Sequence, residues 1–136
     1  MILKKEDRKS LSDLRMAKAR EFLEDAGANH KDKRYKTSIN RSYYAVLNAA
    51  RALLIFESSN PETHEGTVTM LSLRFVKPGH LSKEIVKKFK MLHTRRADVD
   101  YGDFETVDER ESEESLKIAR ETIEEIEHLR QKIIES

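Results

Sequence analysis

Apolar residues recur every three or four positions along most of the chain, which is the spacing of amphipathic helices. This pattern predicts helices at about residues 10–26, 33–58 and 64–75, a fourth that follows Ser82, and a fifth that follows Thr106. No stretch alternates apolar and polar residues as a half-buried strand would. We therefore predict an all-α fold, an up-and-down bundle of four long helices with one shorter helix over 64–75.

The expected helix ends rest on short local signals. Polar residues that can accept a backbone N–H favour a helix start, whereas glycine favours a helix end and proline a loop. These signals are Ser10 with Asp13 as a capping pair, Gly27 as a stop, Pro61 in a loop, Ser82 as an N-cap, and Thr106-x-x-Glu109 as a capping box.

The composition fits this picture. The 136 residues are 38% hydrophobic and 38% charged, which suits one modest core beneath a charged surface, and we expect a single domain over residues 1–136. There is no cysteine, so disulfides and thiolate metal sites are excluded. No apolar run approaches the roughly 20 residues of a membrane span and the N-terminus does not resemble a signal peptide, so we expect a cytoplasmic protein without membrane contact.

Charge is unevenly distributed along the chain. Residues 77–96 contain seven basic residues and one acidic residue, whereas residues 98–127 contain thirteen acidic and three basic residues. Blocks of opposite charge that are adjacent in sequence can face each other across antiparallel helices, within one subunit or between two. The basic block alone would also suit a phosphate-attracting strip, although the acidic residues nearby weaken that interpretation.

One arginine interrupts an apolar stripe. The series Ile85, Phe89 and Leu92 continues at Arg96, so a guanidinium that cannot lose its proton falls on the core-facing side of the helix. Asp100 lies four residues after Arg96, and Asp98 lies three after Arg95, so both arginines have acids at helical spacing. Arg96 therefore either lines a functional cleft or extends to solvent at a helix end.

The most apolar helix carries two adjacent tyrosines. Tyr43 lies on its apolar stripe and is expected to be buried with its hydroxyl hydrogen-bonded, and Tyr44 lies beside it. Asn48 follows Tyr44 by four residues, so Tyr43, Tyr44 and Asn48 are candidates for core or dimer contacts.

Common catalytic and metal-binding motifs are missing. The five histidines form no H-x-x-x-H pair or H-E-x-x-H motif, and His64 is expected to be structural or exposed at a helix start. No glycine-rich phosphate loop or nucleophile elbow is present. We expect no metal and no cofactor.

Four segments together resemble a known family: "SYYAVLNAARALL", "THEG", "FVKPGHL" and "RRADVDYGD". Their order and spacing are similar to the HEPN domain, a prokaryotic helical nucleotide-binding domain, in the branch whose last motif reads roughly R-x-x-A-D-Y. The resemblance implies a helical bundle, a homodimer and a minimal nucleotidyltransferase as partner. Many relatives are metal-independent ribonucleases of toxin–antitoxin systems, with an R-x(4–6)-H motif in which arginine stabilises phosphate charge and histidine transfers protons.

The chain departs from that motif at its last position. Tyr101 stands where the histidine would be expected, and a phenol with an ordinary pKa of about 10 is a poor proton-transfer group at neutral pH. The first hypothesis is therefore a non-catalytic HEPN component. A cleft formed by Arg95, Arg96, Asp98, Asp100 and Tyr101 would bind nucleotide, nucleic acid or the partner, and Tyr101 is a candidate target for nucleotide transfer.

Two alternatives remain open. The protein could be a ribonuclease toxin with a degenerate motif, in which Arg96 acts with His93 three residues before it or with a histidine of a second subunit. It could also be a helical adaptor without ligand, in which the charged blocks set dimer specificity.

Overall fold

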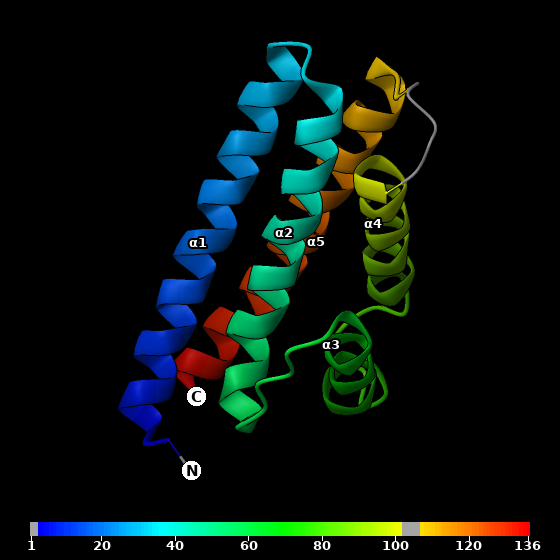
Figure 1. Ribbon diagram of the computed structural model, residues 1–136. Coiled ribbons are helices and arrows are strands. Elements are labelled where there is room, and N and C mark those ends of the chain that lie inside the picture. Colours follow the sequence, from blue (N-terminus) through cyan, green and yellow to red (C-terminus); the bar gives the residue numbers. More distant parts are fainter. Residues whose placement is uncertain (1–2, 102–106) are drawn as a thin grey trace.

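A computed structural model describes the backbone of residues 3–101 and 107–136, and the side chains of these residues except Tyr101. It contains the helices α1 (Lys5–Lys31), α2 (Tyr35–Leu54), α3 (His64–Leu71), α4 (Glu84–Tyr101) and α5 (Glu109–Glu135). A short 3₁₀ helix, η1 (Ile55–Glu57), extends α2, and a π-helical segment, η2 (Ser72–Val76), extends α3. The four long helices alternate in direction, and α3, which follows α2 along the chain, lies at the end of the bundle where α4 begins (Figure 1). The predicted all-α, up-and-down bundle is confirmed.

Helix α2 forms the centre of the bundle and contacts α1, α3, α4 and α5. It is apolar on several sides, because it must bury a face against each of these neighbours. Its buried apolar residues are Ile39, Tyr43, Ala45, Val46, Ala49, Ala50, Ala52, Leu53 and Leu54. Helix α4 adds Ile85, Phe89 and Leu92, so the stripe that leads to Arg96 does face the core.

Helix α1 is longer than expected at both ends. Its first residue is Lys5, so Ser10 lies inside the helix and caps nothing. Gly27 does not end the helix, which continues to Lys31. The reason is tertiary: beyond Gly27, the Nδ1 atom of His30 lies 2.8 Å from the hydroxyl of Ser112 on α5. The turn into α2 instead uses Lys33, whose φ is 63°.

Two other predicted helix starts were wrong in detail. Ser82 donates its hydroxyl and backbone N–H to the carboxylate of Glu125 on α5, at 2.9 and 2.7 Å, so its side chain is committed to another helix. The N-cap of α5 is Asp108, whose Oδ1 accepts from the N–H of Glu111 at 2.9 Å. Thr106, the expected first residue of the capping box, lies outside the described residues.

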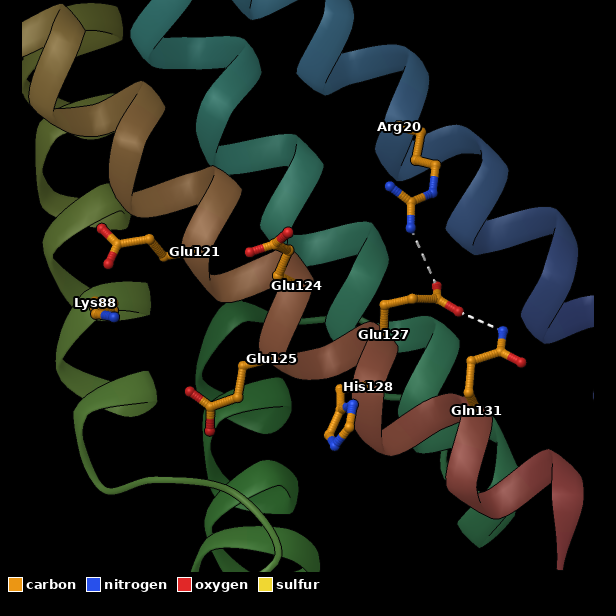
Figure 2. A pocket seen from close by; sticks show the side chains of 8 residues that line it. All are labelled: Arg20, Lys88, Glu121, Glu124, Glu125, Glu127, His128 and Gln131. Atoms are coloured by element: carbon orange, nitrogen blue, oxygen red, sulfur yellow. Dashed lines mark hydrogen bonds and ion pairs between the residues drawn. The ribbon is translucent and has the colours of Figure 1, made fainter.

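The basic and acidic blocks meet in part. Arg95 of α4 pairs with Glu114 of α5 at 2.6 Å. Lower in the bundle, Lys88 of α4 and Glu121, Glu124 and Glu125 of α5 border a hollow of about 860 Å³, shown in Figure 2. Among the helices described, none is both long enough and apolar enough to cross a membrane.

Candidate functional site

The Arg96 side chain lies between α4 and α2 and is only 18% exposed. Its Nε atom lies 3.2 Å from Oδ2 of Asp100, one helical turn further along α4. Its Nη2 atom donates a hydrogen bond of 3.0 Å to the hydroxyl of Tyr44. The carboxylate compensates the charge of the guanidinium, which cannot be removed by deprotonation.

Two aromatic rings hold the same guanidinium. The Cζ atom of Arg96 is 5.5 Å from the ring centroid of Tyr43 and 5.4 Å from that of Tyr44. Cation–π attraction at such distances favours a guanidinium more strongly when the groups are partly desolvated. Burial raises the pKa of Tyr43 to about 12, against a smaller opposing effect of Arg96, so its hydroxyl stays protonated at neutral pH.

A pair of histidines lies beside this arginine. His64, the first residue of α3, stacks on His93 of α4 with 3.6 Å between ring centroids and 12° between ring planes. The Nδ1 atom of His64 lies 3.2 Å from the hydroxyl of Tyr43. The side chain of Thr63 accepts a hydrogen bond from the N–H of Gly66 and so fixes the start of α3. This places His64 over the ring of His93 on α4.

Both imidazoles are neutral at neutral pH. Burial lowers the pKa of His64 to about 4, and the charges of Lys90 and Arg96, together with any proton on His93, lower it further. Burial also lowers the pKa of His93, followed by the charge of Arg96, while Glu65 opposes this. A bound anion would act in the opposite direction and raise the pKa of both rings.

The histidines open onto a groove between α3 and α4 with a volume of about 790 Å³. It combines hydroxyls, two imidazoles and one ammonium with a single carboxylate, a set of groups able to hydrogen-bond a phosphate. The lining residues are Thr63, His64, Glu65, Val68, Thr69, Lys90, His93 and Thr94. We call this the histidine groove; Arg96 lies behind it, where its charge reaches both histidines.

Comparison with known proteins identifies the fold family. A model of the HEPN domain matches residues 12–129. The chain belongs to the HEPN domain family. A "UPF0332 protein" of Thermotoga maritima is 30% identical over 82% of this chain and 85% of its own length. "Putative toxin MJ0605" of Methanocaldococcus jannaschii is 31% identical over 76% of this chain and 74% of its own.

The structure separates the two adjacent arginines of this HEPN protein. Arg95 turns toward α5, where it donates to Oε1 of Glu114 at 2.6 Å and to the hydroxyl of Ser115 at 3.0 Å. The expectation that Asp98 pairs with Arg95 was wrong, because Glu114 takes that place and Asp98 is exposed. Successive helix residues differ by about 100° in direction, so Arg95 and Arg96 serve different faces of α4.

Of the other predicted site residues, Asp100 contacts Arg96 directly. Its two oxygens accept from Nδ2 of Asn40 at 3.1 and 3.2 Å in addition to pairing with Arg96. Tyr101 is the last residue of α4, and its side chain lies outside the described residues. Asn48 donates to the backbone oxygen of Tyr44 within α2 at 2.8 Å and so stabilises the helix locally.

His64 was the residue that the sequence analysis undervalued. It lies 29 positions before His93, so helical spacing gave no reason to place the two rings together. The signal that could have found it was the "THEG" segment, one of the four that carry the resemblance to the HEPN family. Among the described residues, no group of three or more metal-ligating side chains could hold a metal ion.

Proposed function

We propose that this protein is the HEPN-type component of a toxin–antitoxin-like module and that its histidine groove binds a phosphate group of a nucleotide or RNA. The observation that carries the proposal is the stacking of His64 on His93 next to the charge of Arg96. The family membership and the relatives named as putative toxins support it. No metal is required by this chemistry.

The charge of Arg96 is compensated by groups of the protein itself, and this supports the proposal. Arg96 is held by Asp100, Tyr43 and Tyr44, so its position is fixed before any ligand arrives. The two imidazoles are kept neutral by burial and by that fixed positive charge. A phosphate that enters the groove brings a negative charge, which stabilises the protonated form of either ring and adds a charge-assisted hydrogen bond.

The adjacent arginines provide a matched test. We expect Arg96→Gln to weaken binding of a fluorescent oligoribonucleotide by about tenfold, because it removes the positive charge that lies behind the groove. Arg95→Gln removes one positive charge from the neighbouring position. Because the Arg95 side chain pairs with Glu114 of α5, this change should alter the affinity by less than about twofold. Fluorescence anisotropy at fixed salt measures both, since phosphate binding depends on salt.

Equal losses in the two variants would show that the general positive charge of this surface, and not the specific position of Arg96, attracts the RNA. Because Arg96→Gln also removes a packed side chain, His93→Asn serves as a second variant. Weakened binding in His93→Asn with unchanged circular dichroism separates a binding role from unfolding.

The second candidate is a metal-independent ribonuclease, which the paired imidazoles favour. One neutral imidazole would accept the proton of a ribose 2′-hydroxyl while the other, protonated beside the bound phosphate, would donate to the departing 5′-oxygen. This would leave a 2′,3′-cyclic phosphate and a 5′-hydroxyl. Incubation of RNA with the wild type and with His64→Asn in the presence of a chelator distinguishes binding alone from cleavage; intact RNA in both excludes the ribonuclease.

The partner and the oligomeric state belong to the same proposal. We expect a homodimer that associates with a minimal nucleotidyltransferase, as the family resemblance implies. Tyr101 at the end of α4 would accept a nucleoside monophosphate on its phenol oxygen, with release of pyrophosphate. Mass spectrometry after incubation with such an enzyme and nucleoside triphosphate should show the added mass in the wild type and not in Tyr101→Phe.

A further inference from the structure

A second group of arginines, none of which lines the histidine groove, gathers where α1 passes the end of α2. The Nη2 atoms of Arg15 and Arg51 lie 3.0 and 3.3 Å from the same oxygen, Oδ1 of Asn60. The two guanidinium groups therefore lie side by side around one neutral acceptor. Arg8, two turns earlier on α1, reaches the hydroxyl of Ser58 and the carbonyl of Phe56, each at 3.4 Å.

These arginines lack the ion pairs that most of the other arginines in the described part of the chain form. The arginines that form ion pairs are Arg20, Arg34, Arg41, Arg95, Arg96 and Arg130. Across the described part of the chain, by contrast, no carboxylate lies within ion-pair distance of Arg8, Arg15 or Arg51. Glu57 and Glu62 belong to the same connection, yet neither pairs with them.

Burial and the proximity of the two guanidinium groups both disfavour their charged forms. Burial, followed by the positive charge of Arg51, lowers the pKa of Arg15 from its ordinary value. The Nε atom of Arg51 is buried and has no hydrogen-bond acceptor among the described residues. Two partly desolvated like charges repel each other unless an anion lies between them.

Capping of α2 explains only one contact of this group. Nη1 of Arg15 donates to the carbonyl oxygen of Arg51 at 3.3 Å, near the C-terminus of α2, where cations are favoured. That bond fixes the Arg15 side chain and leaves its Nη2 on the exposed amide of Asn60. Within the described residues Arg51 makes no comparable capping bond, so its orientation toward Arg15 needs another reason.

We propose that Arg15 and Arg51, with Arg8 beside them and Asn60 at their centre, form a binding site for a phosphate group. Paired guanidinium groups match the oxygens of a phosphate better than any other side chains do. A phosphate oxygen would take the place that the Asn60 amide oxygen now occupies, and the half-buried arginines are already held in position. The site shares no residue with the histidine groove and does not rest on the function proposed for it.

The test compares thermal unfolding in inorganic phosphate with unfolding in chloride at equal ionic strength. A ligand that binds only the folded state raises the melting temperature. We expect phosphate to raise the melting temperature of the wild type more than that of Arg15→Gln/Arg51→Gln. Arg34→Gln/Arg74→Gln, which removes two exposed arginines elsewhere, is the control and should respond as the wild type does.

General salting effects of phosphate act on every variant alike, so only the difference between them counts. An equal rise in the wild type and in Arg15→Gln/Arg51→Gln would overturn the proposal. The same would follow if Arg34→Gln/Arg74→Gln lost the response as well. Because Arg15 and Arg51 repel each other, neither substitution is expected to prevent folding, and the single variants provide a check.

The source of the phosphate is then separated by comparing ligands. Titration calorimetry with inorganic phosphate, a 5′-mononucleotide and a short oligoribonucleotide ranks them by affinity. A mononucleotide that binds no more tightly than inorganic phosphate supports a site for the free ion. Tighter binding that Arg15→Gln and Arg51→Gln each reduce by about tenfold, the value of one lost charge-assisted contact, supports a nucleotide or RNA phosphate.

Discussion

Tyr43 organises the histidine groove through four different contacts. Its ring packs edge-on against Phe89, lies 5.4 Å from the ring of His93, and faces the guanidinium of Arg96. Its hydroxyl lies 3.2 Å from Nδ1 of His64. Because burial keeps the pKa of this hydroxyl at about 12, the group is a constant hydrogen-bonding partner over the whole range in which the histidines titrate.

The lowered pKa of His64 predicts a pH-dependent stability. Between about pH 4, its pKa in the folded protein, and about pH 6.5, the unfolded chain binds this proton and the folded chain does not. The contribution is therefore fully present above pH 6.5 and is lost as the pH falls toward 4. Solvent screening at this half-buried ring keeps it on the order of 1 kcal/mol.

Urea unfolding of the wild type and of His64→Gln over this pH range measures the effect. The free energy of unfolding should fall more steeply with acidification in the wild type than in the variant, because carboxylate titrations are common to both. Parallel curves would show that the ring of His64 is not desolvated in solution. The pKa of His93 is also lowered, so this ring acts in the same direction. His93 is present in both proteins and therefore does not contribute to the difference between them.

At the scale of the helix, Gly27 shows how contacts with other helices overrule a local stop signal. Glycine weakens a helix because it has the greatest backbone freedom to lose. Helix α1 nevertheless continues past it, since Ala26 accepts a hydrogen bond from Ser38 of α2 at 2.8 Å and His30 contacts Ser112 of α5. The backbone at Gly27 has no positive φ, so nothing in its conformation requires glycine.

Gly27→Ala should therefore stabilise the protein by about 0.5–1 kcal/mol, because alanine has less freedom to lose on folding. The added Cβ would meet Nη2 of Arg120 at 3.5 Å, an ordinary contact. Gly79→Ala is the opposite case: its φ of 89° is strained for alanine, and we expect a loss of about 1 kcal/mol. Urea unfolding midpoints measure both; a destabilised Gly27→Ala would contradict the helix described here.

At the scale of the whole molecule, the sequence predicted the bundle better than the site. The apolar spacing in α2, α4 and α5 directly reflects burial, so it predicted the fold. It also placed Arg96 on the core-facing stripe of its helix, but left open whether the side chain lines a cleft or extends to solvent. Pairing between helices does not leave such a period. The contacts of His64 with His93 and of Arg95 with Glu114 depend on how α3 and α5 approach α4, which local spacing cannot specify.

Arg130 is the clearest contact of this kind, because it joins the last helix to the first. Its side chain is only 7% exposed, and its Nη1 donates to Oδ1 of Asp13 on α1 at 2.7 Å. Nη2 pairs with Oε1 of Glu127 at 3.0 Å, and Nη1 also reaches the hydroxyl of Ser12 at 3.3 Å. The arginine thus satisfies acids from both ends of the chain at once.

Arg130→Met should lower the free energy of unfolding by about 2 kcal/mol. Removing one partner of a buried ion pair leaves the other charge uncompensated, which costs about 3–5 kcal/mol when both are fully buried. The cost is smaller here because Asp13 is 45% exposed and water can solvate it. Arg20→Met is the matched control: Arg20 pairs with the same Glu127 at 3.6 Å but is 55% exposed, so its loss should cost less than about 1 kcal/mol. If urea unfolding shows equal losses for the two variants, burial of Arg130 does not set its contribution, and the connection between α1 and α5 must rest on apolar packing instead.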